Sequence, residues 1–279
     1  MTIRSLRQLS SKSRTTAPNA RALAAVFILA LPLFAQQQQQ QSGPRPKTQA
    51  ESDALQKVLQ AQQSGNWDAE IQAINNVLEN FADTQYKPLL LNMAVDAAQN
   101  KGDYAQTIAF GEQAVQADPN NITARVTLAE DIAQHTREND LDKDQSLKKV
   151  DDYANKALEL LKNASTPPPG MNPATWPDTQ KLLTSQSYDA LGQAADLRKN
   201  YTDAIKQFQA AISADPSNSI AQARLAKAYV DNKQYDEGIA QADKVLALPN
   251  LVPAIKNYAQ TEKDRATKLK AAGTPNSKP

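Results

Sequence analysis

Cysteine is absent from this 279-residue chain, and histidine occurs once, as His135. These absences exclude disulfide frameworks, thiol nucleophiles and zinc sites built from cysteine or several histidines. Glycine is also scarce, with 8 residues, well below the roughly 7% of an average protein. Because alanine and glutamine are abundant and little interrupts helix propagation, we expect an all-α chain. No glycine-rich phosphate loop or catalytic constellation occurs, so we expect a protein that is not an enzyme and binds no cofactor or metal.

The net charge of +1 is unevenly distributed along the chain. The first 35 residues hold five of the 31 bases and no acid, which leaves 26 bases against 30 acids in the rest. Binding to nucleic acid or to an anionic membrane surface needs a basic face. A mildly acidic body therefore argues against a nucleic-acid partner.

The N-terminus is typical of an export signal. Its five bases are Arg4, Arg7, Lys12, Arg14 and Arg21. They precede an apolar run over residues 22–35 that ends in Ala35. A basic region, an apolar run and a small residue at its end are the parts of a secretory signal peptide. We predict export to the periplasm or the cell exterior, with a signal peptide at 1–35 and a mature chain that begins at Gln36. The alternative is an uncleaved segment that anchors the protein in the inner membrane through residues 22–35.

Residues 36–50 begin with six consecutive glutamines and continue with proline, glycine and charged residues. Such a composition buries little apolar surface, so we predict a Gln-rich disordered linker at 36–50. Residues 273–279 are expected to form a disordered tail.

A short pattern returns along the rest of the chain. It consists of a turn followed by an aromatic residue: Gly65-Asn66-Trp67, Gly102-Asp103-Tyr104, Lys199-Asn200-Tyr201 and Lys233-Gln234-Tyr235. Tyr201 and Tyr235 are 34 residues apart, and two of the copies end in Asp-Pro, at Pro119 and Pro216. A fixed period of this length indicates a repeat architecture.

These residues resemble the tetratricopeptide repeat, a helix-turn-helix unit of 34 residues. The copy at 185–218 matches the family pattern at Leu191, Gly192, Ala195, Tyr201, Ala204, Phe208, Ala211 and Pro216. Small residues at Gly192 and Ala204 let paired helices approach closely, and Phe208 fills the space between them. The resemblance implies a right-handed superhelical solenoid of about five repeats with a C-terminal capping helix.

The expected repeat domain covers residues 51–250. Its predicted units are 51–84, 88–121, 122–164, 185–218 and 219–250, followed by a capping helix at 251–272. The third unit contains an insertion at 136–146. A second insertion at 165–177 contains five prolines, which oppose helix formation, so we expect an extended segment there.

The resemblance implies that the first helices of the repeats line a concave groove that binds a protein or peptide. The groove positions are Asn92, Asp96, Gln99, Glu130, Gln134, Asp189, Gln193, Asp196, Arg224 and Lys227. Their polar and partly acidic character favours a basic or amide-rich partner. The competing interpretation is that these are ordinary solvated helix faces.

The other residues considered as metal ligands or partner contacts are interpreted as structural. Asp140, Asp142 and Asp144 follow the spacing of a calcium loop, but Gln145 replaces the glycine that the loop requires, so we interpret the segment as a solvated acidic insertion. His135 is expected at a helix C-terminus. Trp176 is interpreted as packing onto the repeat, with an exposed hook for a partner as the alternative.

Two functions remain open from the sequence. The first is an exported, non-enzymatic adaptor that binds a protein or peptide in its groove. The second is a membrane-anchored structural or self-assembling subunit that keeps its N-terminal segment.

Overall fold

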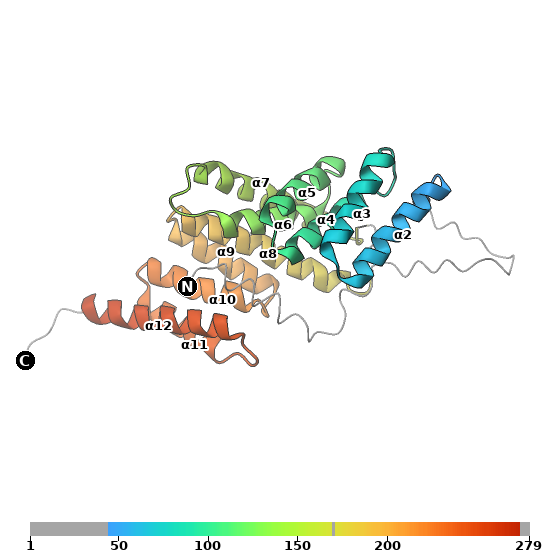
Figure 1. Ribbon diagram of the computed structural model, residues 1–279. Coiled ribbons are helices and arrows are strands. Elements are labelled where there is room, and N and C mark those ends of the chain that lie inside the picture. Colours follow the sequence, from blue (N-terminus) through green and yellow to red (C-terminus); the bar gives the residue numbers. More distant parts are fainter. Residues whose placement is uncertain (1–43, 169–170, 274–279) are drawn as a thin grey trace, which may run out of the picture. The chain divides into compact units, whose positions relative to one another are not determined.

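The computed structural model describes residues 44–168 and 171–273, and this part of the chain contains eleven helices and no strand (Figure 1). The predicted all-α class is confirmed. The export segment 1–35, most of the linker and residues 274–279 lie outside the described residues, so these assignments stay predictions. The described chain divides into an N-terminal unit, which is mainly residues 44–124, and a C-terminal unit, which is mainly residues 125–166 and 173–273.

The N-terminal unit consists of two helix hairpins. Its helices are α2 (Gln49–Ser64), α3 (Trp67–Asn80), α4 (Lys87–Lys101) and α5 (Tyr104–Ala117). Each helix packs on the next, and their apolar faces form one core. The core centres on Val58, Ile74, Val77, Leu91, Ala94 and Ala98, all of which are buried. Apolar residues at helical spacing thus place one face of each helix inside.

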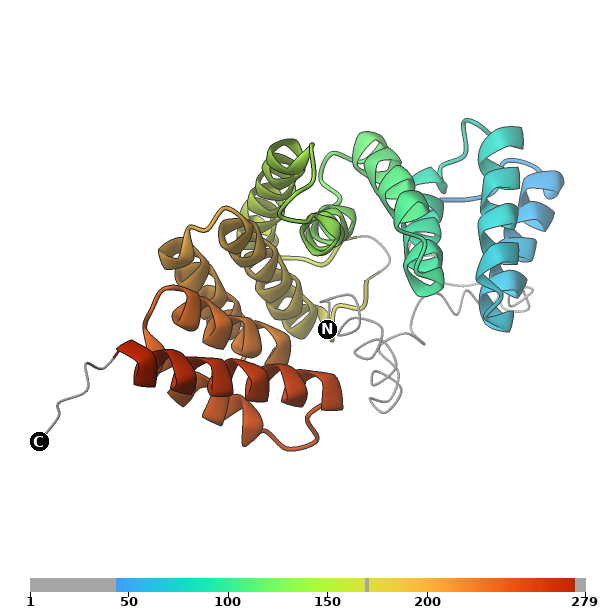
Figure 2. The same ribbon diagram turned by 60° about the vertical axis from the view of Figure 1, so that its left-hand side comes forward.

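The C-terminal unit continues the series of hairpins. Its helices are most of α6 (Ile122–His135), α7 (Lys143–Asn163), α8 (Trp176–Leu197), α9 (Tyr201–Ala214), α10 (Ser219–Asp231), α11 (Tyr235–Leu246) and α12 (Pro253–Gly273). From α7 onward each helix packs against its successor. Figure 2 shows α12 running along α10 and α11, and both contacts are extensive. Burial of Ile255 and Ala259 of α12 beside Val245 joins this last helix to the core.

The repeated turn pattern has a specific physical role. The residue two positions before each aromatic has a positive φ: 66° at Gly65, 73° at Gly102, 61° at Lys199 and 63° at Lys233. This left-handed residue ends the first helix of a hairpin. The side chains of Asn66, Asp103 and Asn200 then accept hydrogen bonds from amides in the first turn of the second helix. In these three turns one tripeptide therefore ends one helix and caps the next, whereas Gln234 of the fourth turn makes no capping hydrogen bond.

Two helices begin earlier than the sequence predicts. α8 begins at Trp176, inside the segment expected to be extended and before the boundary predicted at residue 185. Pro177 is compatible with a helix at this place, because the first turn has no intrahelical partner for its amides. Trp176 is only 4% exposed, so it packs against the protein and does not project as a hook. The expectation of an extended chain is wrong for these two residues.

The other early start lies in the insertion at 136–146. α7 begins at Lys143, so the last residues of this insertion are helical. Asp140 accepts a hydrogen bond of 2.7 Å from the amide of Arg137, and the carboxylate of Asp142 accepts one from Ser146. These acids therefore order the turn that precedes α7.

The N-terminal boundary of the repeats also differs from the prediction. α2 begins at Gln49, within the predicted linker, and Thr48 caps it through a hydrogen bond from the Glu51 amide. Tyr86 donates a hydrogen bond of 2.8 Å to the Pro44 carbonyl, and Lys47 forms an ion pair of 2.5 Å with Asp83. The segment before α2 is thus held by the connection between α3 and α4. Within the described helices, none combines the length and apolar character that crossing a bilayer requires.

Candidate functional site

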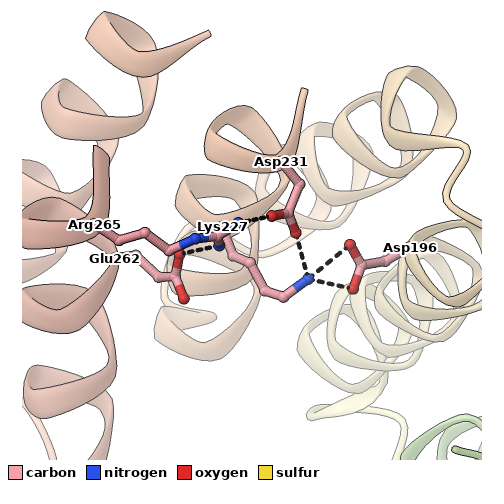
Figure 3. Close-up of polar contacts among 5 residues, drawn as sticks. All are labelled: Asp196, Lys227, Asp231, Glu262 and Arg265. Carbon is pink, nitrogen blue, oxygen red and sulfur yellow. Dashed lines mark hydrogen bonds and ion pairs between the residues drawn. The ribbon is translucent and has the colours of Figure 1, made fainter. Parts of the chain in front are cut away.

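A network of five charged side chains joins three helices of the C-terminal unit (Figure 3). It consists of Asp196 on α8, Lys227 and Asp231 on α10, and Glu262 and Arg265 on α12, and we call it the charged network. The Lys227 ammonium lies 2.7 Å from Asp196 and 2.6 Å from Asp231. Arg265 pairs with Asp231 and lies 2.8 Å from Glu262. Each of the two bases thus bridges two carboxylates.

Within the charged network, burial and neighbouring charges have opposite effects on the pKa values of the side chains. Burial alone would lower the pKa of Lys227, but Asp196 and Asp231 raise that pKa above its ordinary value. Burial favours a higher pKa for Asp231, and hydrogen bonds from Lys227 and Arg265 bring it below the ordinary value instead. At Glu262 burial outweighs the attraction of Arg265, so its pKa is raised. Lys227 therefore stays charged, while Glu262 binds its proton more tightly than an exposed glutamate.

A second contact between α8 and α10 is buried. Arg224 donates a hydrogen bond to the Asp189 carboxylate, and the two side chains are 9% and 5% exposed. Gln193 donates a further hydrogen bond of 3.2 Å to the same carboxylate oxygen, Oδ2. Burial raises the pKa of Asp189, against the opposing effects of Arg224 and Gln193. The other oxygen, Oδ1, is buried without a hydrogen-bond partner.

In the N-terminal unit the predicted groove residues Asn92, Asp96 and Gln99 lie on α4. Asn92 accepts a hydrogen bond of 2.8 Å from Asn121, which directly precedes α6. Asp96 is exposed, and its charge acts on Glu70 of α3, which is only 2% exposed. Burial, with a smaller effect of Asp96, raises the pKa of Glu70 to about 7.

The structure therefore places the ten predicted groove residues in several groups. Asp189, Gln193 and Arg224 contact one another, and Asp196 contacts Lys227. Glu130 and Gln134 lie on α6, where Glu130 accepts a hydrogen bond from Gln186 of α8. Contact of any of these residues with a partner stays a prediction.

Sequence reasoning missed Asp231, Glu262, Arg265 and Glu70. One signal was present for Asp231 and Arg265. Asp231 and Arg265 are 34 residues apart, as are Asp236 and Lys270, which also form an ion pair. An acid and a base separated by one repeat period occupy equivalent places on successive hairpins, so their pairing could have been predicted.

In the charged network, acidic and basic side chains on different helices neutralise one another. Its acids and bases form ion pairs that join α8, α10 and α12. Within the described part of the chain, no group of three or more histidine, aspartate or glutamate side chains is placed to hold a metal ion.

Comparison with known proteins agrees with this geometry. Residues 197–256, which include α9, α10 and α11, match the family model of the tetratricopeptide repeat. The structure resembles the crystal structure of MamA protein, with 16% identity, coverage of 81% of this chain and 98% of that one, and a TM-score of 0.53. At this identity the likeness concerns the fold. No curated protein sequence matches the chain.

Two further solved structures are similar at lower scores. One is a thermophilic TPR protein in Thermus thermophilus, with 16% identity, coverage of 76% of this chain and 98% of that one, and a TM-score of 0.45. The other is MamA 41-end from Desulfovibrio magneticus RS-1, with 14% identity, coverage of 72% and 96%, and a TM-score of 0.47.

The consecutive hairpins with a common turn define a helical-repeat protein. The family match at residues 197–256 and the likeness of the fold support a tetratricopeptide-repeat protein, as the sequence predicts. Repeats of this kind generally serve as scaffolds that bind other proteins or peptides, and they are generally not catalysts.

Proposed function

We propose that the protein is an exported, non-enzymatic scaffold that binds a protein or peptide along the first helices of its hairpins. The observation that carries the proposal is the repetition of hairpins with one capped turn, including the matched segment 197–256. Within each unit, a repeat contacts its neighbours, so successive first helices offer adjacent surfaces to an extended partner.

The exposures along these helices divide the groove residues by role. Asp96 is exposed to solvent. The side chains of Asp196 and Lys227 are 21% and 28% exposed. These are the residues that we assign to partner contact. Asp189 and Arg224 are buried against each other, so we assign them to holding α8 and α10 in place.

The acidic balance of the N-terminal unit favours a basic or amide-rich partner. Residues 44–124 contain ten acids and five bases. Complementary charge at the partner would speed association and make binding sensitive to salt.

Affinity capture with the purified protein as bait tests the binding proposal. The matched variants are Asp96→Lys on α4 and Gln116→Lys on the exposed side of α5. We expect an envelope protein that the unchanged protein and Gln116→Lys capture and that Asp96→Lys loses. Retention of the same partner by Asp96→Lys at equal yield would contradict binding at α4.

The export proposal has a separate test in the native host. N-terminal sequencing combined with cell fractionation should find a soluble envelope protein that begins at Gln36. An intact Met1 in the membrane fraction would instead support the anchored, structural or self-assembling subunit.

A further inference from the structure

Glu70 occupies a position that three other hairpins fill with a small residue. It stands three residues after Trp67, and the residues three after Tyr104, Tyr201 and Tyr235 are Thr107, Ala204 and Gly238. All four of these residues are buried. A Cβ atom added at Gly238 would lie 2.7 Å from Val230 of the preceding helix, which shows how closely the paired helices approach there.

The carboxyl group of Glu70 is poorly satisfied at this position. Its Oε2 atom is buried without a hydrogen-bond partner. At the equivalent position, Thr107 donates its hydroxyl hydrogen to the Asp103 carbonyl at 2.9 Å. A buried polar atom without a partner is costly, and the cost grows when the group carries a charge.

The charged groups of the adjoining helices do not offset the charge of Glu70. On α4, Asp96 adds a like charge, and Lys101 lies 2.6 Å from Asp68, with Asp103 also within 4 Å. On α2, Glu51 accepts hydrogen bonds from Thr84 and the Lys47 amide, while Asp53 and Lys57 are exposed. Loss of the Glu70 proton therefore places a negative charge in a close-packed site beside another acid.

We propose that Glu70 makes the hairpin of α2 and α3 a pH-responsive element, closed when its carboxyl is protonated and loosened when the carboxylate must reach water. Loosening moves α3 away from α2 and α4, the helices against which it packs. Asp96 lies on α4, so the predicted groove surface there changes with the hairpin.

The pH range follows from the surroundings of Glu70. Burial first, and the charge of Asp96 second, raise its pKa from 4.5 to about 7. Between these two values the folded chain keeps a proton that the unfolded chain has lost. Stability therefore falls as pH rises from about 4.5 to about 7, and the loss is complete above that range.

Hydrogen exchange of the purified protein at pH 5.5 and pH 8, corrected for the intrinsic pH dependence of exchange, tests the proposal. We expect protection of amides in α2 and α3 to fall about tenfold or more at pH 8, with amides of α9 as the internal reference. In Glu70→Gln, which keeps the shape without the ionisation, this fall should disappear. Glu79→Gln, at an exposed position of α3, should keep it.

A second variant guards against poor folding of Glu70→Gln. Glu70→Ala introduces alanine, the residue that stands at the equivalent position 204. In this variant the amides of α2 and α3 should be equally protected from exchange at both pH values. Equal protection of the unchanged protein at pH 5.5 and pH 8 would overturn the proposal. An unaltered pH response in both Glu70 variants would also overturn it.

Discussion

Arg224 of α10 donates a hydrogen bond to the carboxylate of Asp189 on α8, and both side chains are almost fully buried. The two residues stand on the first helices of successive hairpins, so their contact links one repeat to the next. A buried ion pair adds little over a well-packed apolar pair, but loss of one partner leaves a buried charge. The pair therefore fixes how α8 and α10 fit together.

Replacement of Arg224 by methionine should destabilise the protein by about 3–5 kcal/mol near pH 8. The loss should be smaller at pH 5, because burial raises the pKa of Asp189 and the carboxyl can protonate once Arg224 is gone. Urea unfolding at the two pH values measures both effects. The double variant Asp189→Leu with Arg224→Met should regain most of the stability; a single variant within about 1 kcal/mol of the unchanged protein would contradict this prediction.

Gly192→Ala should destabilise the pair α8 and α9 by about 1–3 kcal/mol through overpacking. A Cβ atom at this position would lie 2.5 Å from the ring of Phe208. Phe208→Leu in the Gly192→Ala background should cost less than it does alone, because the smaller side chain relieves the clash. A double-mutant cycle by thermal unfolding checks this coupling, and strictly additive effects would show that the ring and residue 192 do not meet.

Lys233→Gly should stabilise the protein by about 0.5–1 kcal/mol. Lys233 has φ 63°, a left-handed conformation at the end of α10 that glycine adopts without strain. The neighbouring change Asn232→Gly is the matched control, because Asn232 has φ −81° and gains nothing from glycine. Melting temperatures should rise for the first variant only. Equal shifts for both would contradict the role assigned to the left-handed turn.

The repeats could be predicted because their turns carry a local signal. In three hairpin turns a left-handed residue, a capping Asn or Asp and an aromatic residue lie next to one another. The fourth turn has the left-handed residue and the aromatic residue, with Gln234 between them, so all four turns are visible in the sequence. The starts of α7 and α8 carry no such tripeptide. Prolines near Trp176 suggested an extended chain, although Pro177 is acceptable in the first turn of a helix.

The candidate site was less predictable than the fold. The sequence pattern selected Asp189, Asp196, Arg224 and Lys227 as groove positions, but partners on other helices decide whether a charge is buried or available. Glu70 shows the same limit. Its helix and position follow from the repeat, whereas the missing hydrogen-bond partner of its carboxyl depends on three-dimensional packing.

Site-specific photo-crosslinking in the native host tests the central claim, that the first helices bind a partner protein, most directly. A photoreactive residue is placed at Asp96 or Gln99 on α4, and at Gln113 or Gln116 on exposed positions of α5 as controls. The account predicts one common crosslinked protein from the α4 positions and none from the α5 positions. Crosslinks to that protein from α5 alone, or to equal extents from both helices, would contradict it.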